Sequence, residues 1–173
     1  RCLSDWSSDV CSSDLRAIPG LYDSLPPPLQ KIADRFEASP TDEALSAIHA
    51  IVRNWRESHG ARLALAPTVP LYCSDRFILA CHGMALEGGL PLHMHIGESK
   101  AEAVGAIQRY GKSMAAHMDA IGFLGPTLTA AHAVWLDGED IKRFADRGVR
   151  VAHNPGSNMR LGCGISPVAS LRA

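Results

Sequence analysis

Apolar segments of strand length alternate with helical segments along most of this 173-residue chain, and this alternation constrains the fold most strongly. Segments 90–96, 128–136 and 149–153 have the composition of strands, and helical periodicity separates them. Strands that recur after helices, at intervals of roughly 20 to 35 residues, indicate βα units and a parallel sheet. Apolar runs such as LTAAHAV suit strands that are buried on both faces. We therefore expect an α/β fold.

The helical segments carry start signals and apolar residues at helical spacing. Ser39-Pro40-Thr41-Asp42 combines a capping hydroxyl, a proline and a carboxylate, which predicts a helix start; this helix should end near 59–60. In the predicted helix 100–110, Val104, Ile107 and Tyr110 align on one side. Further helices are predicted at 29–36, 77–88, 114–121 and 139–146.

The strand and helix pattern fits either an open doubly wound sheet or a (β/α)₈ barrel. The dinucleotide fingerprint GxGxxG and the phosphate-binding GxxxxGK[ST] are both absent from the sequence. A whole barrel needs about 250 residues. With a short apolar run at 61–66, the chain supplies about four strands, so a barrel would be incomplete.

Composition excludes several classes of partner. The chain has 17 basic and 18 acidic residues and a formal net charge of −1, which predicts no nucleic acid and no anionic membrane as partner. No apolar run reaches the roughly 20 residues that cross a bilayer, and no secretion signal is recognisable. The five cysteines form no CxxC pair. We expect a cytoplasmic protein.

Residues 1–15, RCLSDWSSDVCSSDL, differ from the rest of the chain. They lack apolar periodicity, and a codon string for residues 5–15 resembles a sequencing-library adaptor. We interpret residues 1–15 as a translated artefact that is disordered, and leave them out of the fold. The alternative is a natural polar tail, which would be disordered as well.

Three predicted strands each carry a histidine near the C-terminal end: His95, His132 and His153. In parallel α/β folds these ends meet at one edge, where side chains can share a ligand or a metal. The alternative for any one of them is a hydrogen-bonded core histidine. His93 lies two residues before His95, so both face the same side of a strand.

Glu98 follows three residues after His95, just past the predicted strand. Neutral imidazoles bind zinc or ferrous iron, and a nearby carboxylate can move protons. Glu98 also precedes a helix, whose N-terminal dipole favours a negative charge. Both roles can hold together.

Three segments in this order, HMHIGES, TAAHAVWLDGEDI and VAHNPGSNMRLGCGISPV, resemble the chlorohydrolase and cytosine-deaminase-like branch of the amidohydrolase superfamily. The resemblance runs from about Arg62 to the C-terminus. It implies a metal-dependent TIM-type (β/α)₈ barrel of which about strands 4 to 7 are present. Residues 16–173 would then be a partial barrel that lacks its N-terminal and C-terminal parts.

The resemblance implies roles for individual residues. His95 matches a metal-binding histidine, Glu98 the glutamate that shuttles protons, and His132 a histidine that polarises the reacting group. His93 occupies a position where the family often has a histidine that is not always a ligand, so a structural role is equally open. A pocket-lining motif matches His153, Asn154, Ser157 and Asn158, for which hydrogen bonds that hold the loop are the preferred reading.

The departures from the family pattern are equally informative. The family's first-strand HxH pair has no counterpart, because the sequence contains HxH only at His93-Met94-His95. The eighth-strand aspartate should follow a strand after residues 167–171, and the sequence ends at Ala173. One expected metal ligand of four is therefore present.

The resemblance implies that the parent protein is a metal-dependent aminohydrolase. It would use a metal-activated water to hydrolyse a C–N bond of a small heterocyclic amine. The cofactor would be one divalent metal, zinc before iron. The alternatives are a truncated barrel that is inert as it stands, and a hydrolase that removes an alkylamine or chloride from the same kind of ring. A phosphate-binding α/β enzyme is a third, weaker alternative. Substrate identity and homo-oligomerisation of the parent stay open.

Overall fold

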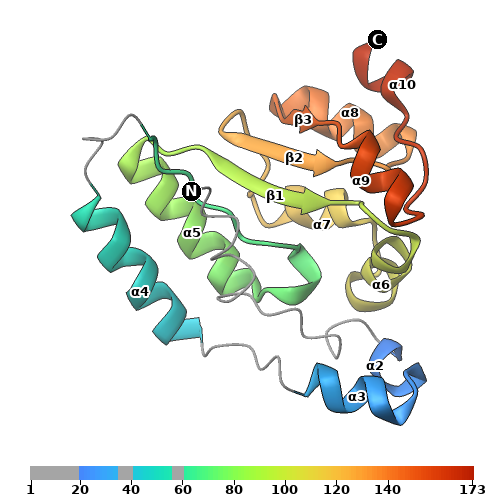
Figure 1. Cartoon of the computed structure of the whole chain (residues 1–173). Coiled ribbons are helices and arrows are strands. Elements are labelled where there is room, and N and C mark those ends of the chain that lie inside the picture. Colours follow the sequence, from blue (N-terminus) through green and yellow to red (C-terminus); the bar gives the residue numbers. More distant parts are fainter. Residues whose placement is uncertain (1–19, 35–40, 56–60) are drawn as a thin grey trace.

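The computed structural model describes residues 20–34, 41–55 and 61–173 of the chain. The N-terminal stretch 1–15 lies outside these residues, and so do Ser39, Pro40 and the helix end predicted at 59–60. Within the described part of the chain, the structure is an α/β arrangement around an open parallel sheet (Figure 1). The predicted fold class is confirmed.

The sheet contains three parallel strands in the order β1-β2-β3. These are β1 (Leu92–Ile96), β2 (Leu128–His132) and β3 (Arg150–Ala152). The run predicted as a strand at 61–66 forms an isolated parallel bridge, Leu65 to Leu92. Farther along this edge, the backbone N–H of His95 donates to the carbonyl of Thr68 at 2.9 Å. The chain around 65–68 therefore follows the outer edge of β1 without becoming a regular strand.

Helices lie between and around the strands (Figure 1). Their bounds are α2 Leu21–Ser24, α3 Pro27–Ala33, α4 Thr41–Asn54, the 3₁₀ helix η2 Pro70–Tyr72, α5 Asp75–Gly88, α6 Lys100–Tyr110, α7 Met114–Ala120, α8 Gly138–Arg147, α9 Pro155–Arg160 and α10 Val168–Arg172. The predicted helices 77–88, 100–110, 114–121 and 139–146 are confirmed to within two residues. Helix α4 extends to Asn54 within the described residues, while α9 and α10 were not predicted.

Serine hydroxyls set the starts of three of these helices. Ser74, Ser99 and Ser113 each accept a hydrogen bond from the backbone N–H three residues farther on, and they begin α5, α6 and α7. Such caps satisfy an N–H group that the helix leaves unpaired, and each stabilises a helix by about 1 kcal/mol. These serines therefore determine where α5, α6 and α7 begin.

The core lies between one face of the sheet and helices α5, α6, α7 and α8. Leu92, Met94 and Ile96 of β1 are at most 2 % exposed and belong to this core. The side chains between them, His93 and His95, lie on the opposite face, as the strand period requires. The prediction that these two histidines share one face is confirmed.

Helix α6 buries a different side from the one that its apolar residues suggest. Its buried residues are Glu102, Gly105 and Ala106, whereas Val104 and Ile107 are 47 % and 55 % exposed. Ala106 belongs to the core, and Glu102 bonds to the backbone before the helix. The backbone contact of Glu102 and the packing of small residues thus determine the orientation of α6.

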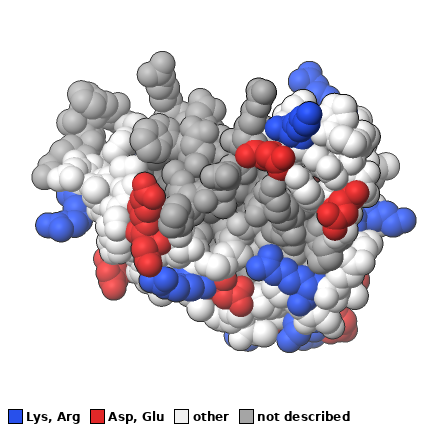
Figure 2. All heavy atoms as spheres, turned by 90° about the horizontal axis from the view of Figure 1, so that it is seen from below, with Lys and Arg blue, Asp and Glu red and all other residues white. Residues whose placement is uncertain are grey.

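Acidic and basic side chains are interspersed on the face seen in Figure 2. This distribution matches the near-zero net charge of the chain. In the described ranges, the structure has no helix with the length and apolar composition to span a bilayer.

Candidate metal centre at the strand ends

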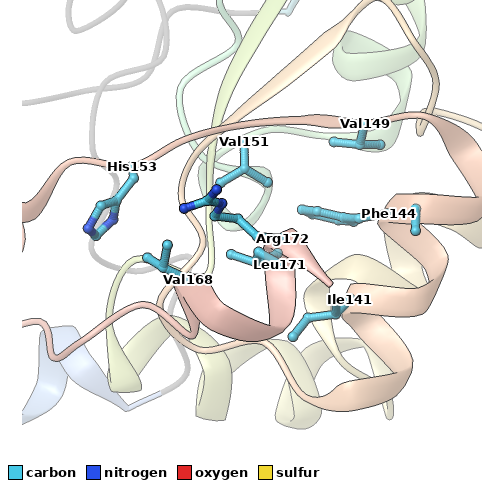
Figure 3. Close-up of a pocket in the computed structure, with 9 residues that line it drawn as sticks. Ile141, Phe144, Val149, Val151, His153, Val168, Leu171 and Arg172 are labelled. Atoms are coloured by element: carbon cyan, nitrogen blue, oxygen red, sulfur yellow. The ribbon is translucent and has the colours of Figure 1, made fainter.

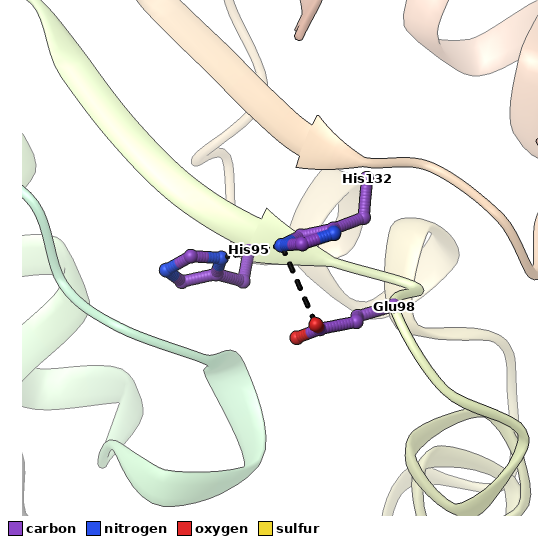
Figure 4. Close-up of side chains that lie close together, drawn as sticks. All are labelled: His95, Glu98 and His132. Carbon is purple, nitrogen blue, oxygen red and sulfur yellow. Dashed lines mark hydrogen bonds and ion pairs between the residues drawn. The ribbon is translucent and has the colours of Figure 1, made fainter. Parts of the chain in front are cut away.

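The end of β2 has an unusual backbone that determines where His132 points. His132 and Ala133 have φ values of 72° and 49°, in the left-handed region that non-glycine residues rarely adopt. In the sheet register His132 lies beside Ile96, a core residue. A regular strand would therefore direct His132 towards the helices. The left-handed turn brings its ring instead to the ring of His95 (Figure 4).

His95, Glu98 and His132 converge at the C-terminal ends of β1 and β2 (Figure 4). The Nδ1 atom of His95 lies 3.0 Å from Nε2 of His132, and Oε1 of Glu98 lies 3.6 Å from the same Nε2. One ligand atom from each residue lies within 4.8 Å of the other two. Two imidazole nitrogens and a carboxylate oxygen are a donor set that zinc accepts, so these residues could hold a metal ion.

The surroundings of His95 favour its neutral form, which is the form that binds metals. Burial lowers the pKa of His95, and the neighbouring His132 lowers it further, while the charge of Glu98 acts in the opposite direction. His132 is 3 % exposed. The side chains of the site are thus largely shielded from solvent, where electrostatic interactions are stronger than in water.

Two asparagines contact the ring of His132. The Oδ1 atom of Asn158 lies 2.8 Å from Nδ1 of His132, and Nδ2 of Asn154 lies 3.5 Å from Nε2. Asn158 is 1 % exposed, so its side chain contacts His132 in the interior of the chain.

Residues 154–166, here called the 154–166 segment, hold the turn that follows β2. The hydroxyl of Ser166 donates to the carbonyl of Ala133 at 2.8 Å, and the indole N–H of Trp135 donates to the carbonyl of Cys163 at 2.7 Å. The carbonyl of Gly97, after β1, accepts from the backbone N–H groups of residues 134 and 135 at 2.9 and 2.8 Å. These bonds compensate for the strained backbone and connect the ends of β1 and β2.

Glu102, which was not predicted as a site residue, holds the backbone of Glu98. Its Oε2 accepts from the backbone N–H of Glu98 at 3.1 Å, and its own N–H donates to the Ser99 hydroxyl at 3.2 Å. The sequence Ser99-x-x-Glu102 is a capping-box pattern, a signal that could have identified this residue. Burial raises the pKa of Glu102 to about 7; the hydrogen bond from Glu98 lowers it, and the charge of Glu98 raises it.

Tyr72 lies close enough to both glutamates to respond to their charges. Burial raises the pKa of Tyr72 to about 12, and the charges of Glu102 and Glu98 act in the same direction. The thiol of Cys163 lies 3.9 Å from Oε1 of Glu98. Neither residue was predicted to lie near the site, because both are distant from Glu98 in the sequence.

The remaining predicted site residues lie elsewhere. His93 and Ser157 are exposed, and neither belongs to the group of three. His153 follows β3 and lines a separate pocket between α8, β3 and α10 (Figure 3). That pocket has a volume of about 350 Å³ and is lined by Ile141, Phe144, Ala145, Val149, Val151, His153, Val168, Leu171 and Arg172. Of the three strand-end histidines, the structure brings together His95 and His132.

The fold and the site define a parallel α/β protein with a histidine–glutamate group at its strand ends. Residues 17–172 match the amidohydrolase family. The chain therefore belongs to the amidohydrolase family, as the sequence motifs predicted.

Curated relatives at 39–41 % identity are deaminases. The chain is 39 % identical over 132 residues to a 5-methylthioadenosine/S-adenosylhomocysteine deaminase of Syntrophobacter fumaroxidans, an alignment that covers 76 % of this chain and 30 % of the relative. It is 41 % identical over 119 residues to a 5'-deoxyadenosine deaminase of Methanosarcina mazei, covering 68 % of this chain and 28 % of the relative. The chain thus spans about 30 % of the length of these relatives.

Solved structures of other proteins contain a region with the same fold as this chain. An adenosine deaminase from Xanthomonas campestris with bound zinc superposes with a TM-score of 0.72 at 30 % identity, covering 78 % of this chain and 31 % of that protein. A zinc complex of the atrazine chlorohydrolase from Arthrobacter aurescens TC1 gives 0.73 at 26 % identity, covering 79 % and 31 %. The chain is thus a partial amidohydrolase related to metal-dependent deaminases.

Proposed function

We propose that the protein carrying this chain is a zinc-dependent aminohydrolase that removes the amino group of an adenine nucleoside or a similar heterocyclic amine. The observation that carries the proposal is the convergence of His95, Glu98 and His132 at the strand ends. The relatives at 39 % and 41 % identity, deaminases of adenosine analogues, support this substrate class.

The donor set fits a zinc ion, and His95 is the residue that we assign as its ligand in this chain. A zinc ion at this position would supply Lewis-acid activation of water at neutral pH. The lowered pKa of His95 supports this assignment, because a neutral imidazole needs no deprotonation before it binds a metal. The zinc-bound relatives favour zinc over iron.

Glu98 and His132 would perform the proton transfer and the charge stabilisation. In the proposed reaction water adds to the ring carbon that bears the amino group, ammonia leaves, and the ring keeps a carbonyl oxygen. Glu98 carries one proton of the attacking water to the neighbouring ring nitrogen, and the second proton of that water to the departing amine, which leaves as ammonia. The Nε2 atom of His132, 3.6 Å from Glu98 Oε1, stabilises the negative charge on the attacking oxygen by donating a hydrogen bond when the His132 ring is cationic.

The 173-residue chain is expected to be inactive when it is isolated. Among its described residues, the three site residues supply one assigned metal ligand, whereas a catalytic zinc ion generally uses three protein ligands. A second candidate activity is the hydrolytic removal of chloride or an alkylamine from a triazine-like ring. The likeness to atrazine chlorohydrolase favours it less, because the identity there is 26 %.

The experiment is a substrate screen with the complete protein that carries this chain. Purified with zinc, it should release ammonia from 5'-deoxyadenosine or S-adenosylhomocysteine and lose this activity when a chelator removes the metal. The isolated 173-residue chain is the matched negative control. Turnover of atrazine without turnover of any amino-bearing nucleoside would replace the proposal with its second candidate.

A further inference from the structure

The buried side chain of Asn158 makes one hydrogen bond in the described part of the chain, to the ring of His132. Its Oδ1 lies 2.8 Å from Nδ1 of His132, whereas its Nδ2 has no hydrogen-bond partner among the described residues. Leaving a buried donor unpaired costs about 1–3 kcal/mol, a penalty that an apolar residue of the same size would avoid. Packing alone therefore does not explain why an asparagine occupies this position, whereas its hydrogen bond with His132 does.

The contact determines which nitrogen of His132 carries hydrogen. A carbonyl oxygen only accepts, so Nδ1 of His132 must donate to Asn158. In the neutral ring the other nitrogen, Nε2, then carries a lone pair, which faces Nδ1 of His95 at 3.0 Å. The amide Nδ2 of Asn154, a donor, lies 3.5 Å from Nε2 and is compatible with that lone pair.

We propose that Asn158 is a positioning residue that keeps hydrogen on Nδ1 of His132 and directs Nε2 towards His95 and Glu98. The inference rests on the proposed function, since the role of His132 depends on which nitrogen faces the reacting centre. With Nδ1–H fixed, Nε2 is an acceptor when the ring is neutral and a donor when it is cationic. In both states the same atom faces Glu98.

The position of Asn158 is itself well determined. Its backbone carbonyl accepts from the N–H of Cys163 at 2.9 Å, and its N–H donates to the carbonyl of Asn154 at 3.0 Å. The 154–166 segment is in turn bonded to the turn after β2 through Ser166 and Trp135. The acceptor that faces Nδ1 is therefore held by a rigid frame, which suits a group that orients a catalytic side chain.

The test is nitrogen NMR of the 173-residue chain labelled with ¹⁵N-histidine. At about pH 8, above the usual imidazole pKa, the nitrogen that bears hydrogen and the bare nitrogen have clearly different shifts. The variant His132→Ala identifies the His132 signals among the eight histidines of the chain. No metal and no substrate are needed, so failure of the deaminase proposal would leave this measurement intact.

The wild-type chain should show hydrogen on Nδ1 of His132. Asn158→Asp keeps an oxygen at the same place and should preserve that form, whereas Asn158→Leu removes it and should produce exchange between both forms. Asn154→Leu is the matched control and should leave Nδ1–H in place, and circular dichroism checks the fold of each variant. Hydrogen on Nε2 in the wild type, or an unchanged His132 spectrum in a folded Asn158→Leu chain, would overturn the proposal. If Asn158→Leu does not fold, the position of hydrogen on His132 in the wild type and in Asn158→Asp tests the proposal.

Discussion

Nε2 of His132 lies 3.0 Å from Nδ1 of His95, although His132 is the sheet neighbour of the core residue Ile96. The contact exists because His132 has a φ of 72°, which reverses the direction that a regular strand would give its side chain. Left-handed backbone at a non-glycine residue costs about 1–2 kcal/mol. Strain of this kind concentrates at functional sites, where surrounding contacts maintain it.

Zinc binding should distinguish the two histidines of β1. His93→Ala and His95→Ala remove imidazoles from the same face of the same strand, but His95 belongs to the group of three and His93 does not. We expect His95→Ala to weaken zinc binding by the complete protein that carries this chain at least about 10-fold, a factor typical for disturbed metal sites. His93→Ala should bind as the wild type does.

Isothermal titration calorimetry with zinc chloride measures both affinities. Equal losses in the two variants would indicate non-specific binding to exposed imidazoles. Wild-type affinity in His95→Ala would remove His95 from the site.

Gly97 should tolerate alanine much less well than Gly111 does. Both glycines have left-handed backbone, with φ values of 63° and 68°. A Cβ at Gly97 would lie 3.2 Å from the carbonyl oxygen of Trp135, whereas a Cβ at Gly111 would meet nothing within 4 Å. Gly111→Ala should therefore cost about 1 kcal/mol of unfolding free energy. Gly97→Ala should cost about 2–3 kcal/mol, since a backbone contact adds to the strain.

Urea denaturation followed by circular dichroism measures these two costs. Similar midpoints for both variants would mean that the turn after β2 can move away from Gly97. The bonds from residues 134 and 135 to the Gly97 carbonyl argue against such a movement.

The helices and the approximate places of the strand-end histidines could be predicted from the sequence, but the site could not be completed. Apolar periodicity is a local signal, and it located α5, α6 and α7 to within two residues. The direction of the His132 side chain depends on left-handed backbone at both His132 and Ala133. Alanine rarely adopts this conformation, so it could not be predicted from the sequence. Helix α9 was missed because its glycine, serine and asparagine residues favour turns.

The role of Glu102 shows a different limit. Its capping-box spacing is visible in the sequence, yet its burial is not, since burial depends on how α6 packs on the sheet. Val104 and Ile107 are apolar residues at helical spacing, yet they are exposed, so their spacing did not indicate which side of α6 packs on the core. Where a buried polar contact competes with apolar periodicity, periodicity alone predicts the wrong face.

Glu102 should make stability depend on pH. Its pKa rises from the ordinary 4.5 to about 7 in the folded chain, so the folded state binds more protons than the unfolded state between these values. The stability that this group contributes is fully present below its unfolded pKa and is lost as pH rises to about 7. A shift of this size corresponds to roughly 3 kcal/mol.

Glu102→Gln keeps an oxygen that can accept from the Glu98 N–H and removes the titration. Relative to the wild type, this variant should therefore become more stable as pH rises from about 5 to about 8. Glu87→Gln, at an exposed position of α5, is the matched control and should change little relative to the wild type. Urea unfolding across this range measures the differences, and a flat difference for Glu102→Gln would contradict the assigned burial effect.

Glu98→Gln in the complete protein should separate proton transfer from metal binding. Glutamine preserves the size of the side chain but cannot shuttle a proton, so we expect turnover to fall by at least about 100-fold. Zinc content should stay stoichiometric, because His95 and not Glu98 is the proposed ligand. Metal analysis and ammonia release on the same preparation measure both properties. Loss of zinc together with activity would assign Glu98 to the metal instead, and unchanged activity would exclude it from the reaction.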